Sequence, residues 1–215
     1  MYSKFESLTN EKQLRILNAA FDEFSQKKFR EASTDTIATK AEISKGALFQ
    51  YFGTKKKLYE YVYSYGYQML KDELYGKIDF SIADIFDRLR QILHAKIDVF
   101  FQHPTLFDFL VFAYSFEDDA SIKQLTIDKN SQEYEQFSLQ VFEGLDYSRF
   151  KAGIDVNKSL RVILWTVDGY SKMQVELMES CSEKGNKQEL YKQWSDEFDI
   201  YMSMLKKAFY RTDSS

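Results

Sequence analysis

The scarcity of proline and glycine is the feature that most limits the folds open to this chain. Only one proline and eight glycines occur in 215 residues, so the turn signals that would connect many short strands are missing. Apolar residues instead recur mostly three or four positions apart, which is the period of one face of an α-helix. The sequence therefore predicts an all-α protein of about nine or ten helices.

Caps and breaks in the apolar pattern place these helices. Ser81, followed three positions later by Asp84, has the spacing of a capping box, and Asp155 can cap a helix that begins at Val156. The stretch 120–145 is expected to be broken or kinked, and 181–187 is expected to be a loop. The expected helices span residues 9–26, 34–41, 45–52, 55–75, 81–104, 106–116, 120–145, 156–182 and 190–209. The first should bury the face formed by Leu14, Leu17, Phe21 and Phe24.

Composition places the chain among soluble globular proteins, with 44% hydrophobic and 29% charged residues. The longest apolar runs are about ten residues, too short to cross a bilayer. The N-terminus has no basic region followed by an apolar run, so we expect no secretory signal, no membrane partner and a cytoplasmic location. Cys181 is the only cysteine, which excludes an internal disulfide.

The distribution of charge differs between the two ends of the chain. The net charge of −4 hides a surplus of three positive charges in residues 1–60 and an excess of seven negative charges in residues 61–215. A basic N-terminal segment is compatible with a nucleic-acid partner, although scattered solvated charge would give the same count.

Residues 33–52 contain the pattern most informative about function. Two short helices are separated by a three-residue turn, and Ser44 is placed to cap the second. This is the arrangement of a helix-turn-helix, whose second helix enters the major groove of DNA. The residues expected to pack inward are Ile37, Ala38, Ala41, Ile43, Leu48 and Phe52. Those expected to face outward are Lys45, Gly46, Ala47, Phe49, Gln50 and Tyr51.

The outward residues suit base reading. Gln50 can donate to and accept from adenine, and Lys45 can reach guanine or a phosphate. The ring of Phe49 can contact a thymine methyl, and Gly46 and Ala47 are small where the backbone approaches DNA. An ordinary helical hairpin would explain Leu48 and Phe52 but not three aromatic residues within four positions.

The same segment resembles the N-terminal signature of the tetracycline-repressor (TetR) family over about residues 10–60. The resemblance is carried by IA at 37–38 and by AEISKGALFQYFGTKKKL at 41–58. It implies a three-helix DNA-binding domain over residues 1–54 and a larger helical-bundle domain for ligand sensing and dimerisation over 55–215. It also implies base or groove contacts from Lys45, Gly46, Ala47, Phe49, Gln50 and Tyr51, and phosphate contacts from Ser33, Thr34, Ser44 and Lys55. Because Thr54 can cap the helix that Lys55 begins, a phosphate contact from Lys55 is also physically reasonable.

Three residues depart from the pattern of that family. Glu42 stands where a glycine is frequent, which would cost about 1 kcal/mol if the residue is left-handed. Phe49 replaces the more usual tyrosine and therefore has no hydroxyl to give to a phosphate. Asp35 lies where some members carry a basic groove-reading residue, and we assign it no contact because an acid would repel phosphate.

The C-terminal part resembles the family only in pattern, chiefly in Ile154-Asp155 and Asp168-Gly169. The resemblance implies that the last two long helices pair with their copies in a homodimer, through a seam from Leu190 to Phe209 and a face from Leu160 to Leu177. An intrachain core would explain the same seam. It also implies an effector cavity lined by aromatic residues, for which the candidates are Tyr65, Phe101, Phe107, Tyr114, Phe137 and Trp165. Few charges accompany these rings, so an apolar or aromatic effector is expected.

The sequence thus predicts a ligand-responsive repressor that binds palindromic double-stranded DNA as a homodimer. An alternative is a DNA-tethered protein-interaction module with no small-molecule inducer. An enzyme is not expected, since no glycine-rich phosphate loop or polar catalytic cluster is present. His94 and His103 are the only histidines, so we expect no metal site and no cofactor.

Overall fold

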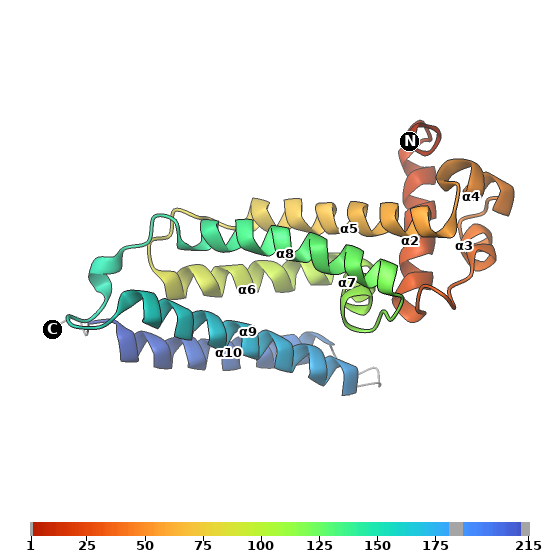
Figure 1. The fold of residues 1–215 in the computed structure, drawn as a ribbon. Coiled ribbons are helices and arrows are strands. Elements are labelled where there is room, and N and C mark those ends of the chain that lie inside the picture. Colours follow the sequence, from red (N-terminus) through yellow and green to blue (C-terminus); the bar gives the residue numbers. More distant parts are fainter. Residues whose placement is uncertain (1, 181–186, 212–215) are drawn as a thin grey trace. The chain divides into compact units, whose positions relative to one another are not determined.

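The computed structural model describes residues 2–180 and 187–211, with the side chains of 127–135, 138, 175, 176, 178–180, 187 and 188 left aside. The described chain is helical throughout (Figure 1), and its single β-type contact is an isolated bridge between Phe150 and Tyr210. The helices are α1 (Ser3–Glu6), α2 (Asn10–Gln26), α3 (Thr34–Lys40), α4 (Lys45–Phe52), α5 (Lys55–Lys77), α6 (Ile85–Gln102), α7 (Pro104–Ser115), α8 (Ala120–Phe142), η1 (Tyr147–Arg149), α9 (Val156–Ser180) and α10 (Lys187–Phe209).

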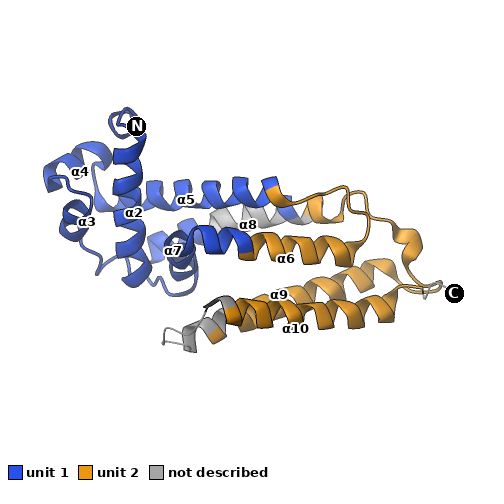
Figure 2. Ribbon diagram, turned by 180° about the vertical axis from the view of Figure 1, so that it is seen from behind, with its two compact units in different colours: residues 1–76, 98–137 blue, residues 77–97, 138–215 orange. Residues whose placement is uncertain are grey.

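By packing, the chain divides into two compact units, coloured separately in Figure 2. Unit 1 comprises residues 1–76 and 98–137, and unit 2 comprises residues 77–97 and 138–215. Unit 1 is larger than the three-helix domain that ends at residue 54, because α7 packs closely on α2. The functional division at residue 54 remains a prediction.

Unit 1 has a continuous apolar core that joins the helix-turn-helix to α5 and α7. Leu17, Phe21 and Phe24 of α2 are buried there, as the sequence predicts. Leu14, expected on the same face, is instead about half exposed. α5 can approach α2 and α7 closely because it carries Gly66, where a Cβ would collide with the side chain of Leu106.

Unit 2 is built around α9 and α10, which lie side by side (Figure 1). Trp194 and Phe198, which belong to the predicted C-terminal seam, are buried inside this unit. The fully buried Arg88 of α6 donates to five backbone carbonyls, including those of Val141 and Glu143 at the end of α8. This guanidinium therefore satisfies carbonyls that the helix end leaves without partners.

Among the described residues, the predicted boundaries of the long helices agree with the structure within a few residues, but two of the predicted features are absent. Ser81 does not cap α6. The cap is Asp84, whose Oδ1 accepts from the N–H groups of Phe86 and Asp87 at 2.9 and 3.3 Å. The expected break in 120–145 is absent, since α8 runs unbroken to Phe142. The expected loop 181–187 lies outside the described residues except for Lys187, which begins α10.

Candidate nucleic-acid interface

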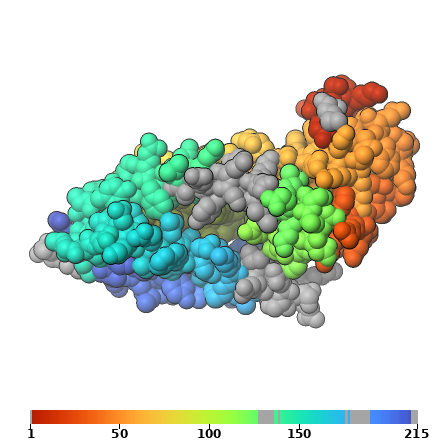
Figure 3. All heavy atoms as spheres, in the orientation of Figure 1, coloured from red at the N-terminus to blue at the C-terminus, as the bar shows by residue number. Residues whose placement is uncertain are grey.

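Local side-chain caps begin both helices of the helix-turn-helix. Ser33 Oγ accepts from the N–H of Thr36 at 3.2 Å, and Ser44 Oγ accepts from the N–H of Ala47 at 3.1 Å. Gly53 ends α4 with φ 76°, a conformation that costs glycine nothing. The segment around residue 50, orange in Figure 3, protrudes at the surface in that view.

The inward face of α3 and α4 agrees with the sequence prediction. Ile37, Ala38, Ala41, Leu48 and Phe52 are buried, and Ile43 packs partly buried against the same core. Burying these apolar side chains against α2 fixes the angle of α4 and turns its other side to solvent.

The outward face of α4 is only partly exposed to solvent. Lys45, Gly46 and Gln50 are exposed, whereas Ala47 and Phe49 are half-buried. Tyr51 is also half-buried, because its ring lies 6.3 Å from that of Phe5 in α1. Among the predicted base readers, the most exposed are therefore Lys45 and Gly46 at the start of α4, together with Gln50.

The short helix α1, which the sequence pattern did not predict, supports α4 from behind. Phe5 is fully buried, and its ring centroid lies 4.8 Å from that of Phe52 and 5.2 Å from that of Tyr61. Four residues are too few for a hydrophobic period to be visible, so the only signal was the two aromatic residues Tyr2 and Phe5 ahead of the first long helix.

The turn between α3 and α4 contains the strained residue that the sequence led us to expect. Glu42 has φ 54°, in the left-handed region, and its N–H donates to the carbonyl of Thr39 at 3.1 Å. Arg15 of α2 contacts the turn through two interactions. Its Nε donates to the carbonyl of Ala41 at 2.9 Å, and its Nη1 lies 3.2 Å from Glu42 Oε2.

Lys45, the first residue of α4, is paired with an acid. Its Nζ lies 2.7 Å from Oδ2 of Asp35, in the first turn of α3. Asp35, to which the sequence analysis assigned no DNA contact, therefore lies beside Lys45, a predicted base reader.

Lys55 is positioned by the loop between α2 and α3. Thr54 Oγ1 accepts from the N–H of Lys57 at 3.2 Å and so caps α5, as expected. Lys55 Nζ donates to the carbonyl of Arg30 at 3.2 Å and lies 4.9 Å from the centroid of the Phe29 ring. Partial burial lowers the pKa of Lys55 below its usual value.

Two glutamates hold that loop at its ends. Glu23, which is buried, accepts from the N–H of Ser33 at 2.8 Å, and Ser33 in turn caps α3. Glu117, also buried, accepts from the N–H of Phe29 at 2.8 Å. Predicted phosphate contacts Ser33 and Lys55 are thus both anchored to the core of unit 1.

This arrangement matches a known family of proteins. Residues 16–62 match the family described as bacterial regulatory proteins, tetR family. The helix-turn-helix segment therefore matches the TetR family. The members of that family are described as regulatory proteins, and the sequence analysis likewise expects no enzyme. No curated protein sequence matches the chain significantly.

Solved TetR-family structures share the fold of the whole chain. A TetR family transcriptional regulator from Chloroflexus aurantiacus J-10-FL is 22% identical, with a TM-score of 0.64 and 98% of each chain covered. A ketosteroid transcriptional regulator of Mycobacterium tuberculosis is 16% identical, with a TM-score of 0.61 and 95% and 98% covered. A fatty acid degradation regulator from Bacillus halodurans is 14% identical, with a TM-score of 0.60 and 89% and 96% covered. The chain therefore has the fold of TetR-family transcriptional regulators.

The aromatic residues predicted to line an effector cavity of this TetR-type chain are in different settings. Phe107 packs edge-on against Phe100 at 4.6 Å, and Phe101 contacts the same ring at 5.6 Å. Tyr65 and Phe137 are half-buried, with Tyr61 and Tyr75 as their respective ring neighbours. Tyr114 and Trp165 are largely exposed at the surface.

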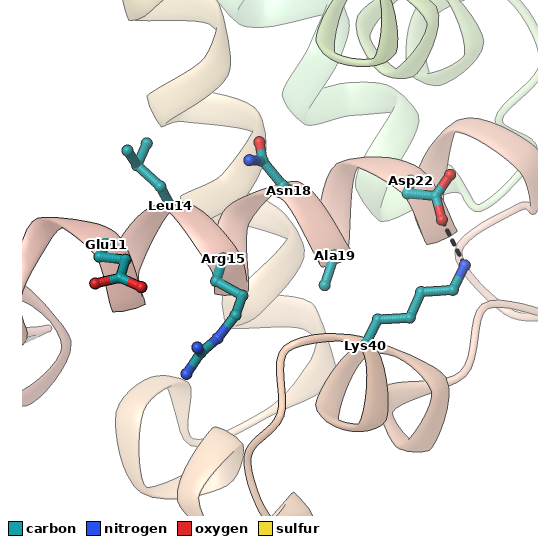
Figure 4. A pocket seen from close by; sticks show the side chains of 7 residues that line it. All are labelled: Glu11, Leu14, Arg15, Asn18, Ala19, Asp22 and Lys40. Atoms are coloured by element: carbon teal, nitrogen blue, oxygen red, sulfur yellow. Dashed lines mark hydrogen bonds and ion pairs between the residues drawn. The ribbon is translucent and has the colours of Figure 1, made fainter.

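A groove of about 470 Å³ lies on the surface of unit 1, and none of these aromatic residues lines it (Figure 4). α2 supplies Leu14, Arg15 and Asp22 among its lining residues, and α3 supplies Lys40, which is paired with Asp22. Leu14 is exposed because it lines this groove. The spacing of apolar residues along α2 does not indicate the groove. Among the described residues, no group of three His, Cys, Asp or Glu could hold a metal ion, and none of the described helices is long and apolar enough to cross a membrane.

Proposed function

We propose that the protein is a ligand-responsive transcriptional repressor that binds palindromic operator DNA as a homodimer and leaves it when a small apolar or aromatic effector binds. The observation that carries the proposal is the recognition helix, which has a buried inner face and exposes Lys45, Gly46 and Gln50 on its outer side. Such a helix places its N-terminal residues against base edges in the major groove.

Gel-shift measurements with operator and random duplexes test the assigned DNA contacts. Gln50→Ala and Tyr51→Ala should weaken operator binding more than random-sequence binding, since these side chains read bases. Lys55→Ala should weaken both and reduce the salt dependence, because a phosphate contact carries no sequence information. Equal losses in all three variants would contradict the assignment.

Exposed apolar stripes on α9 and α10 support the homodimer. Trp165 is 69% exposed, and Ile200 and Met204 of α10 are 60% and 61% exposed. The stripe on α9 consists of Val162, Trp165, Met173 and Leu177, spaced along one side of the helix. Since a monomer seldom leaves such stripes in water, we assign them to a two-fold contact between copies. The predicted seam is thereby revised, because Trp194 and Phe198 pack within the protomer.

Light scattering after size exclusion tests the homodimer. Ile200→Glu with Met204→Glu should give a monomer, because two buried charges without partners would oppose association. Leu139→Glu is the matched control: Leu139 is 69% exposed on α8 and lies outside both stripes. The monomeric variant should also lose operator binding, since a palindrome needs two recognition helices about 34 Å apart. A wild-type monomer would contradict the proposal.

The contacting rings of Phe100, Phe101 and Phe107 support an apolar effector. Two proteins of similar fold are named for ketosteroid regulation and for fatty acid degradation, and both compound classes are mostly apolar. Native mass spectrometry of the purified protein, followed by thermal shifts with a series of steroids and fatty acids, tests this part. Phe107→Ala should abolish the thermal shift. Tyr114→Ala should retain it, because Tyr114, although predicted from the sequence to line the cavity, is 56% exposed. If no compound shifts the wild type and none co-purifies, the alternative of a protein-interaction module is favoured.

A further inference from the structure

We propose that Asp35 and Lys45 act together as a reader of one G·C base pair in each half of the operator. The inference rests on the proposed DNA-binding function and adds to it a specificity-determining residue, Asp35, from the helix before the recognition helix. It also assigns a base-pair identity to a pair of side chains rather than to a single side chain.

The position of the pair is the first step. Lys45 is the first residue of α4, the end of the recognition helix that meets base edges. Asp35 reaches it from α3, with 2.7 Å between Oδ2 and Nζ. The side chains of Asp35 and Lys45 are 67% and 51% exposed, so both charged groups are open to a ligand on their outer side.

The chemistry of the pair matches one base pair. In the major groove a G·C pair presents two adjacent acceptors, guanine N7 and O6, followed by a donor, the cytosine N4 amino group. O6 and N4 are themselves hydrogen-bonded and lie about 2.9 Å apart. An ammonium and a carboxylate in contact are spaced almost identically, so Lys45 can donate to O6 and N7 while Asp35 accepts from N4.

Each group keeps the capacity for this second contact. An ammonium has three hydrogens, of which the bond to Asp35 uses one. The carboxylate of Asp35 retains free lone pairs on both oxygens. The ion pair can therefore stay intact while both partners bind the same base pair.

An A·T pair does not offer the same pattern. Its order in the groove is acceptor, donor, acceptor, so an ammonium that reaches adenine N7 meets the N6 amino group next to it. In the reverse orientation, the thymine methyl group lies beside the O4 acceptor. The pair should therefore discriminate in favour of G·C.

The same carboxylate should weaken binding to DNA of any sequence. It repels phosphates, and it holds Lys45 away from them. Asp35→Ala should therefore strengthen binding to random duplex DNA and steepen the salt dependence by about one unit, because Lys45 becomes free to neutralise a phosphate.

Selection of duplexes from a random pool, performed with the wild type, Asp35→Ala and Lys45→Ala, tests the inference. The wild-type motif should contain a G·C pair in each half-site at which both variants lose about tenfold preference. Asp22→Ala is the matched control, since Asp22 forms an ion pair with Lys40 in the same domain but lies on α2. This variant should select the wild-type motif. Thermal melting should show all three variants folded, because the substituted side chains are all substantially exposed.

The outcomes separate the inference from the function on which it rests. If the wild type enriches no motif, the proposed DNA-binding function fails and the inference fails with it. If the wild type enriches a motif but Asp35→Ala strengthens binding to every duplex by one common factor, Asp35 acts by repulsion alone. That result, or relaxation of different positions by the two variants, would overturn the base-pair reader and leave the proposed function standing.

Discussion

Glu117 accepts a hydrogen bond from the backbone N–H of Phe29 at 2.8 Å, although 88 positions separate the two residues. Glu117 is 2% exposed, and its other oxygen accepts from the N–H groups of Asp118 and Asp119. Lys28–Asp118 and Arg30–Asp119 ion pairs join the same two segments. The loop that follows α7 therefore fixes the position of the loop between α2 and α3. The carbonyl of Arg30, in this second loop, accepts a hydrogen bond from Lys55.

Removing this carboxylate should destabilise the protein and weaken DNA binding. Glu117→Ala leaves three N–H groups without their acceptor, which should lower the free energy of unfolding by about 3 kcal/mol. Urea unfolding measures the loss, and a gel shift should show weaker binding to all duplexes as Lys55 loses its support. Asp118→Asn, which breaks only an exposed ion pair, should cost less than about 1 kcal/mol. Equal costs for both variants would contradict a special role for Glu117.

Relieving the strained turn should stabilise the chain. Glu42 has φ 54°, so Glu42→Gly should gain about 1 kcal/mol from the left-handed conformation. The substitution also removes the ion pair with Arg15, and Glu42→Gln measures that effect alone. Thermal or urea unfolding should rank the glycine variant above the glutamine variant. The reverse order would mean that the turn costs nothing in the native chain.

Stability should depend on pH through Asp84. Burial raises the pKa of this carboxyl group, but hydrogen bonds from Lys206 and from the N–H groups of Asp87 and Phe86 outweigh it and hold the pKa below its usual value. Because the folded pKa is lowered, the contribution is present above the unfolded value of about 4 and is lost as the pH falls below it. Unfolding measured from pH 7 to pH 3 should therefore show a steeper loss for the wild type than for Asp84→Asn, which retains an acceptor for the helix cap. Parallel curves would contradict this assignment.

Removing the Phe5 ring, which packs against α4, should lower both the stability of the protein and its specificity for the operator. Phe5→Ala removes a fully buried ring from contact with Phe52 and Tyr61, at a cost of about 3 kcal/mol. The same ring lies beside Tyr51, so operator binding should fall more than random-sequence binding in gel shifts. Phe5→Leu, which keeps most of the volume, should retain most of both properties. Unchanged specificity in a folded Phe5→Ala variant would show that α1 does not position Tyr51.

The long helices and the helix-turn-helix were predictable because the signals for them are local. The caps Ser33, Ser44, Thr54 and Asp155 each act within three positions, and the apolar period marks the buried face over a few turns. The inward residues of α3 and α4 follow from that period and are buried as expected. The position of Glu42 in the turn indicated a left-handed backbone conformation, and its φ of 54° lies in that region.

Contacts between distant segments were not predictable from the same signals. Ser81 and Asp84 satisfied the same capping rule, and what distinguishes Asp84 is its partners Lys206 and Arg149, far along the chain. Leu14 fitted the apolar face of α2, but the packing of α3 leaves it beside a groove. The seam from Leu190 to Phe209 has the same period whether it packs within the chain or against a copy.

The amino-acid sequence by itself therefore determined where most of the helices lie and predicted that α4 reads DNA, because spacing along a chain dictates caps, turns and amphipathic faces. Only the tertiary structure decided that Asp35 meets Lys45 and that Glu117 holds Phe29. Those pairs depend on the angles and distances at which helices pack, and these are set by the combined volumes of many buried side chains rather than by any local pattern.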